Sequence, residues 1–175
     1  GEWLRLEDVE SRTPQRPATE GCDQGLLVDD AAAPDVHHIA VAERGECGEI
    51  VLGVSSGTMM DELAWAERGK GAWLNGTRLA VSGIDDPDQA AVSTGNIGSL
   101  ARSQGWGPLA EVLGRADRTR GYGDFYHYHL LAAGKIEAVI ESDVNVLDVA
   151  ALSIIVTEAG GVFTDLNGQP APLAP

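Results

Sequence analysis

Carboxylates and histidines lie close together at one point near the beginning of the sequence. Asp29 and Asp30 follow a short apolar run, and three more candidates come a few positions later: Asp35, His37 and His38. A histidine titrates near neutral pH, and an aspartate beside it can determine which ring nitrogen carries the proton. We therefore expect catalytic acid–base chemistry from this group of side chains.

Spacing limits how the histidines can cooperate. In a strand, His37 and His38 point to opposite faces, so at most one of them lines a given pocket. His127 and His129 lie in a predicted helix, where a separation of two residues turns the side chains about 200° apart. These two histidines are therefore not expected to bind one metal ion together.

The elements that must position these groups are predicted from hydrophobic periodicity and from turn residues. Apolar residues at helical spacing predict a helix over 126–133, which Gly134 ends, and another from Asp148 to Gly160. Apolar or alternating runs predict strands at 3–9, 26–28, 39–42, 50–54, 62–67, 91–94, 138–141 and 162–165. Helices and strands alternate without a clean βαβ repeat. We therefore expect an α/β (α+β) fold, a layered sandwich with mixed sheets, in a single domain over 1–175.

Composition excludes several classes of partner and compartment. The chain has 12 Lys and Arg against 27 Asp and Glu, a formal charge of −15, which repels nucleic-acid backbones and anionic membrane surfaces. Cys22 and Cys47 are too few for a disulfide scaffold, and no apolar run approaches the roughly 18 residues of a membrane span. We expect a cytoplasmic protein that binds a small-molecule substrate and forms a homodimer or another oligomer, without nucleic-acid or membrane partners.

Three stretches of the chain have the character of family motifs. Residues 66–76 read AERGKGAWLNG, residues 147–165 contain LDVAA followed by EAGGVFTD, and residues 123–134 read GDFYHYHLLAAG. Over about 36–170 the chain resembles the inositol monophosphatase superfamily, and the third stretch is most similar to its histidinol-phosphatase branch. The resemblance implies a shortened version of that family's layered fold without its N-terminal helices. It also implies Mg²⁺-dependent hydrolysis of phosphomonoesters of small polar alcohols.

The resemblance also implies where metal ligands should lie. The family takes them from a Glu in a GEES-like turn, two Asp in a DPxDGT motif and the Asp of WDxAA. Glu10, Asp29 and Asp148 match three of these positions. Such hydrolysis uses two or three cations about 3.5–4 Å apart, and Mg²⁺ accepts only near-octahedral oxygen coordination.

The fourth ligand position and the phosphate-binding turn depart from the family pattern. Where the family has DPxDGT, Ala32 occupies the position of the second Asp, and the following Gly-Thr becomes Ala33–Pro34. Proline has no N–H to donate to a phosphate. In an alternative alignment, the segment between Asp29 and Ile39 is several residues shorter than in the family and the whole phosphate-binding turn is deleted. Leu147 also replaces the Trp before Asp148. We therefore expect ordinary phosphatase activity to be weak or lost.

The histidinol-phosphatase-like stretch supplies the candidates for substrate binding, which are Asp124, Tyr126 and His127. In that branch, the corresponding region lines the substrate side of the site. Asp124 and Asp148 also have an alternative interpretation without a role in binding or catalysis. Each lies at the start of a predicted helix, where it would act as a capping residue and stabilise the helix through the helix dipole.

Three hypotheses remain open at this point. The first is a repurposed family member that needs no cofactor and carries out metal-independent acid–base chemistry, such as cyclisation, dehydration or isomerisation, in bacterial metabolism. The alternative is a Mg²⁺-dependent phosphomonoesterase of the histidinol-phosphate or inositol-phosphate type. The third is a non-catalytic structural or regulatory partner.

Overall fold

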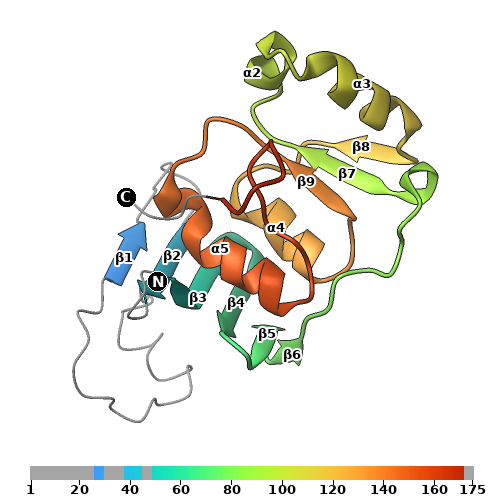
Figure 1. Ribbon diagram of the computed structural model, residues 1–175. Helices are drawn as coiled ribbons and strands as arrows, with labels where there is room; N and C mark the ends of the chain where they lie inside the picture. The colour runs from blue at the N-terminus through green and yellow to red at the C-terminus, as the bar shows by residue number, and fades with distance from the viewer. Residues whose placement is uncertain (1–25, 30–37, 45–48, 172–175) are drawn as a thin grey trace.

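A computed structural model describes residues 26–29, 38–44 and 49–171 of the chain, with side chains described from residue 49 onward. Within these ranges the chain forms two sheets, with helices between them and beside the smaller one (Figure 1). Antiparallel and parallel pairing both occur, which confirms the predicted layered α/β fold.

The larger sheet is antiparallel, and its strand order β1-β2-β3-β4-β5-β6 is also the order along the chain. Its strands are β1 (Leu26–Asp29), β2 (His38–Arg44), β3 (Ile50–Gly57), β4 (Glu62–Glu67), β5 (Gly71–Leu74) and β6 (Thr77–Arg78). Between β4 and β5 the chain reverses through Gly69 and Gly71, whose φ values of 75° and 94° suit glycine. The predicted strands confirmed here are 26–28, 39–42, 50–54 and 62–67.

The smaller sheet is parallel and has the order β8-β7-β9. Its strands are β7 (Ala91–Thr94), β8 (Arg118–Arg120) and β9 (Ala138–Ile140). Parallel neighbours need crossover connections, and helices supply them. The chain passes from β7 to β8 through α2 (Ile97–Arg102) and α3 (Trp106–Arg115), and from β8 to β9 through α4 (Asp124–Ala132). Two short 3₁₀ turns, η1 (Thr58–Met60) and η2 (Pro87–Gln89), precede β4 and β7.

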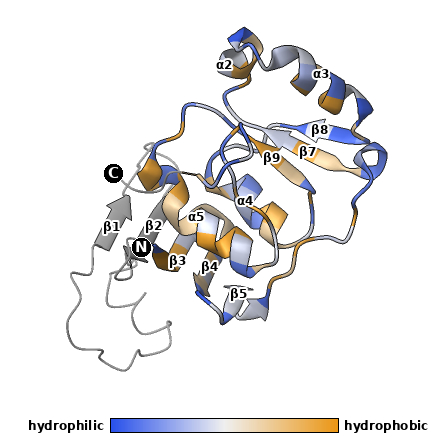
Figure 2. Cartoon of the chain, in the orientation of Figure 1, coloured by the Kyte–Doolittle hydropathy of each residue, from blue (hydrophilic) through white to orange (hydrophobic). Residues whose placement is uncertain are grey.

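Helix α5 (Val146–Glu158) forms the centre of the molecule. It is apolar on all sides, and every residue from Val149 to Val156 is buried, which is typical of a helix covered on all its faces. It packs against β2 to β5 and against α4, and Figure 2 shows the apolar residues concentrated along it and along the strands beside it. No helix in the described part of the chain is long and apolar enough to cross a membrane.

Small residues let the larger sheet approach α5 closely. A Cβ atom at Gly53 would lie 2.6 Å from the carbonyl oxygen of Ala151, so a larger residue would push β3 away from the helix. Fully buried alanines continue this contact along β4 and β5: Ala64, Ala66 and Ala72. Alternation along the strands places Trp65 and Trp73 on the other face, where their rings stack at 4.4 Å.

The predicted ends of the two central helices are confirmed by their hydrogen bonds. After α4, Gly134 adopts a φ of 65°, and the N–H of Lys135 donates to the carbonyl of Leu130. After α5, Gly160 adopts a φ of 93°, and the N–H of Gly161 donates to the carbonyl of Val156. Both ends are Schellman motifs, which place glycine in the left-handed position.

The strand predicted at 162–165 is wrong. This segment forms one isolated bridge, between Thr164 and Pro170, and the side chain of Val162 is 82% exposed. Asp165 instead accepts the backbone N–H groups of Asn167 and Gln169 at 2.8 Å each, which folds the segment into a turn. A segment with alternating apolar residues forms a strand only where a neighbouring strand pairs with it. The strand predicted at 3–9 lies outside the described residues.

Candidate functional site

Glu141 lies at the point where β9 ends and the chain turns toward α5. Its Oε2 atom accepts a hydrogen bond from the hydroxyl of Tyr128 at 3.0 Å and contacts Nε2 of His127 at 3.1 Å. Both partners are buried residues of α4, and the His127 side chain is 0% exposed. Two side chains of α4 therefore hold the carboxylate of Glu141.

The other side of the His127 ring contacts a third element, β7. The Nδ1 atom lies 3.2 Å from the hydroxyl oxygen of Ser93, which itself accepts the backbone N–H of Tyr122. With that N–H accepted, Ser93 can donate its hydroxyl hydrogen to Nδ1. The tautomer with its hydrogen on Nε2 then donates to Glu141, which satisfies every group in the chain of contacts.

Tyr128 donates to Glu141 and lies within the electrostatic influence of a second carboxylate. Burial is the largest cause that raises the pKa of its phenol, followed by the charge of Glu141, the hydrogen bond to Glu141 and the charge of Asp148. The direction of the shift keeps the phenol protonated at neutral pH, so Tyr128 remains a hydrogen-bond donor.

Asp148 lies in the first turn of α5, but it is not the N-cap residue that the sequence suggested. The N-cap is Asn145, whose side chain accepts the N–H groups of Leu147 at 2.8 Å and Asp148 at 3.3 Å. Asp148 returns a bond, because its Oδ2 atom accepts the N–H of Asn145 at 2.9 Å. This capping box satisfies backbone donors at the helix start and holds the carboxylate in one orientation.

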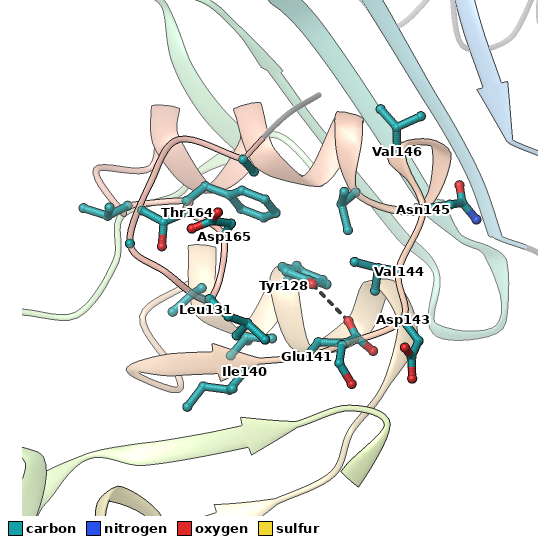
Figure 3. A pocket seen from close by; sticks show the side chains of 18 residues that line it. Tyr128, Leu131, Ile140, Glu141, Asp143, Val144, Asn145, Val146, Thr164 and Asp165 are labelled. Atoms are coloured by element: carbon teal, nitrogen blue, oxygen red, sulfur yellow. Dashed lines mark hydrogen bonds between the residues drawn. The ribbon is translucent and has the colours of Figure 1, made fainter. Parts of the chain in front are cut away.

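A pocket of about 660 Å³ opens beside these groups (Figure 3). Glu141, Asp143 and Asn145 line it from the segment between β9 and α5, and Tyr128 lines it from α4. Thr164 and Asp165 close it from the turn after α5, as Figure 3 shows. Aliphatic side chains and the ring of Phe163 form the rest of the wall. Such a pocket suits a small ligand with hydrogen-bond donors, because its ionisable lining residues are acidic.

His129 forms a second chain of contacts on the other side of α4. Its Nδ1 atom lies 2.7 Å from Glu62 in β4, and its Nε2 atom lies 2.9 Å from the hydroxyl of Ser55 in β3. Burial is the largest influence on its pKa and lowers it, although the hydrogen bond and charge of Glu62 act in the opposite direction. The divergence expected of His127 and His129 is therefore observed, since each contacts a different carboxylate.

The structure describes only some of the predicted site residues. Glu10, Asp30, Asp35 and His37 lie outside the described residues. Asp29 ends β1 and His38 begins β2, and their side chains are not described. The remaining candidates all lie on α4 or α5, the two helices that pack together: Asp124, Tyr126, His127 and Asp148.

On α4, the predicted substrate-binding residues do not share one surface. Asp124 begins the helix, is exposed and has a φ of 46°, and Gly123 occupies the N-cap position. Tyr126 packs edge-to-face against Tyr122 with ring centroids 5.9 Å apart. Neither of them lines the pocket, whereas His127 reaches its wall through Glu141.

The described residues do not complete a magnesium site. Among them, no group of three or more His, Cys, Asp or Glu side chains is close enough to hold a metal ion. Asp148 fits one ligand position, because its carboxylate is held in place by the helix start. The oxygen ligands that Mg²⁺ needs are therefore incomplete within the described ranges.

Sequence reasoning missed Glu141, Ser93 and Glu62 as partners of the α4 histidines. Glu141 carried a usable signal, because it directly follows the apolar residues of β9, a half-buried strand. Ser93 and Glu62 carried none, because nothing local shows that their strands will pack beside α4. Each contact joins residues far apart in the sequence.

Comparison with known proteins supports the resemblance carried by the motifs. A model of the Inositol monophosphatase family matches residues 38–175. The chain is 37% identical over 135 residues to the histidinol-phosphatase of Mycobacterium tuberculosis, covering 73% of this chain and 51% of that protein. It is 35% identical over 129 residues to the inositol-1-monophosphatase of Rhizobium meliloti, covering 72% of this chain and 48% of that protein.

Solved structures agree with this match. The extragenic suppressor protein SuhB of Bartonella henselae superposes with a TM-score of 0.68 at 30% identity, covering 78% of this chain and 54% of that one. The IMPase of Thermotoga maritima superposes with a TM-score of 0.72 at 26% identity, covering 95% and 69%. The chain spans about half the length of the curated relatives that it matches.

Proposed function

The chain belongs to the inositol monophosphatase family, and from this premise we propose that it acts as a phosphomonoesterase on a small phosphorylated alcohol. Histidinol phosphate is the first substrate to consider, because histidinol-phosphatases are among the relatives that share more than a third of their aligned residues with the chain. An inositol phosphate is the second, on the basis of the inositol-1-monophosphatase match.

The observation that carries the proposal is the pair of immobilised carboxylates near the start of α5. Glu141 is held by His127 and Tyr128, and Asp148 is held by the backbone N–H of Asn145. The charges of both carboxylates act on the same phenol, that of Tyr128. Carboxylates held in this way provide fixed negative charge and fixed acceptors without reorganising when a substrate arrives.

In this proposal the two carboxylates have different roles. Glu141 lines the pocket and accepts a hydrogen bond from a hydroxyl or amino group of the alcohol, which orients the ester. Asp148 contributes to cation binding together with Glu10 and Asp29, the ligands that the resemblance implies. Magnesium, when bound, polarises the phosphoryl group and activates water. The reaction consumes one water molecule and yields the free alcohol and inorganic phosphate.

Phosphate release tests the proposal directly. Wild-type protein in millimolar Mg²⁺ is expected to release phosphate from histidinol phosphate, and Asp148→Asn is expected to lower kcat at least a hundredfold because it removes a fixed charge from the site. Asp61→Asn is a matched control, because Asp61 lies in the η1–β4 turn with a φ of 53° that asparagine tolerates. Equal loss in both variants, or equal rates with Mg²⁺ and with a chelator, would contradict the proposal.

A second candidate function is favoured by one feature of the sequence. Ala32 and Ala33–Pro34 stand where the family has its second Asp and the Gly-Thr of its phosphate-binding turn. A protein repurposed for metal-independent acid–base chemistry would bind the unphosphorylated alcohol and release no phosphate. In the same assay, this candidate predicts that histidinol raises the melting temperature while histidinol phosphate remains intact, with or without Mg²⁺.

A further inference from the structure

We propose that His127 is a positioning residue that, with Ser93 behind it, fixes the carboxylate of Glu141 for receiving a hydrogen-bond donor of the substrate. The inference rests on the proposed function, because it assigns how one group of that site is held. It adds Ser93 of β7 and His127 of α4 to a site that already contains Tyr128 of α4 and Glu141, which directly follows β9.

The contacts that lead to Glu141 form one continuous chain with a defined direction. The backbone N–H of Tyr122 donates to Ser93, Ser93 lies 3.2 Å from Nδ1 of His127, and Nε2 lies 3.1 Å from Glu141. Ser93 and His127 are both 0% exposed, so water does not compete for these bonds. A ring held at both nitrogens cannot rotate without breaking a buried hydrogen bond.

Glu141 is also confined by the backbone that follows β7. Gly95 follows β7 directly, and a Cβ atom there would overlap the Glu141 carboxyl group. The N–H of Gly95 donates to the carbonyl of Ile140 at 3.0 Å, which holds this backbone beside the end of β9. The absence of a side chain at Gly95 therefore leaves the space that the Glu141 carboxyl group occupies beside β7.

The two oxygens of the Glu141 carboxylate differ in their described contacts. Both donors to Glu141, His127 and Tyr128, reach Oε2, and none of the described residues donates to Oε1. Among the described residues this leaves Oε1 as the oxygen that Glu141 can offer to a ligand, and Glu141 itself lines the pocket (Figure 3). The arrangement suits a carboxylate that is held by one oxygen and accepts a donor from a ligand with the other.

His129 provides an internal comparison for this role. It is on the same helix, is 1% exposed and joins a serine to a glutamate in the same way. Its ring is reversed, with Nδ1 toward the carboxylate of Glu62, and neither residue lines the pocket. A purely structural role predicts similar effects for both histidines, whereas a positioning role predicts an effect on substrate binding for His127 alone.

The reversed rings define a matched set of variants. A glutamine places an N–H near the position of Nε2, and an asparagine places one near that of Nδ1. His127→Gln therefore retains a donor toward Glu141, and His127→Asn loses it. For His129 the two substitutions exchange roles, because its carboxylate contact uses Nδ1. Each position thus has one conservative variant and one disruptive variant of the same two residue types.

The main experiment measures KM and kcat for histidinol phosphate in these four variants of the full chain. We expect His127→Asn to raise KM about tenfold with kcat changed less than about threefold, as for loss of a fixed charged hydrogen bond used in binding. We expect His127→Gln to restore KM to within about threefold of the wild-type value. Both His129 variants should leave KM unchanged, even where they lower the melting temperature. Equal KM effects in the two series would overturn the proposal.

A second measurement does not depend on turnover. Nitrogen-15 NMR of the imidazole rings should show hydrogen on Nε2 of His127 and on Nδ1 of His129 at neutral pH. If the wild type releases no phosphate, the proposed function fails, and the Kd of unphosphorylated histidinol from calorimetry replaces KM in the same comparison. A His127 ring with its hydrogen on Nδ1 alone, or His127→Asn binding histidinol as tightly as the wild type, would contradict the positioning role.

Discussion

His127 and His129 leave α4 in opposite directions, and each meets a carboxylate from a different sheet region. Nε2 of His127 contacts Glu141 at 3.1 Å after β9, and Nδ1 of His129 contacts Glu62 at 2.7 Å at the start of β4. The helix lies between the two sheets, so each ring connects it to one of them (Figure 1). Opposite tautomers of the two rings satisfy both contacts, with hydrogen on Nε2 of His127 and on Nδ1 of His129.

The His129 contact predicts a decrease in stability in mild acid. Burial lowers the pKa of His129 in the folded protein from its ordinary value of 6.5, so the unfolded chain binds a proton that the folded chain does not. Stability is therefore complete above about pH 6.5 and falls as the pH drops toward the folded pKa. Urea unfolding at pH 7.5 and 5.5 should show a lower midpoint at pH 5.5.

His129→Asn is the variant that checks the origin of this decrease. Asparagine does not titrate in this range, so the difference between the two pH values should shrink in the variant. If His129→Asn loses as much stability between pH 7.5 and 5.5 as the wild type, then another group is responsible.

Asn145 is expected to contribute to stability and to activity through the same bonds. Asn145→Ala removes the acceptor for the N–H groups of Leu147 and Asp148, which should lower the free energy of unfolding by about 1 kcal/mol. The loss also frees the start of α5, where Asp148 is held, so kcat for phosphate release should fall. Asn145→Asp keeps an acceptor and should restore most of the melting temperature.

Glu158 connects two of the sequence motifs, and its removal should destabilise the turn between β4 and β5. Its carboxylate accepts the N–H of Gly69 and the N–H of Gly71 at 2.8 Å each. Glu158→Ala leaves both donors without this partner and should lower the free energy of unfolding by about 1–3 kcal/mol. Glu111→Ala, on the exposed surface of α3, is the control and should change it by less than about 0.5 kcal/mol. Indistinguishable urea midpoints for the two variants would disprove this role.

The positions of most strands and of the central helices could be predicted from local patterns. Strands that follow one another in the larger sheet also pair with one another, so hairpin signals sufficed for β2, β3 and β4. The glycines after α4 and α5 marked the helix ends, because glycine adopts the left-handed conformation that follows a helix without a steric penalty. The motifs likewise indicated the family, which the match over 38–175 confirms.

Local patterns failed where a partner from elsewhere decides the outcome. The alternation at 162–165 predicts a strand, but among the described residues the segment pairs only through the bridge between Thr164 and Pro170. Asp148 was interpreted as a possible N-cap, but Asn145 reaches the free N–H groups from the cap position. In both places a side chain accepts backbone N–H groups in an arrangement that competes with the predicted one, Asp165 in the turn and Asn145 at the helix start.

Motifs and periodicity within short windows were therefore enough to predict the family, the layered architecture and the candidate residues on α4 and α5. Tertiary structure alone decided which carboxylate each histidine meets. Ser93, His127 and Glu141 come from β7, α4 and the end of β9, and they meet only because the parallel sheet packs on the helix. Hydrogen bonds between distant residues depend on this packing, which no local pattern encodes.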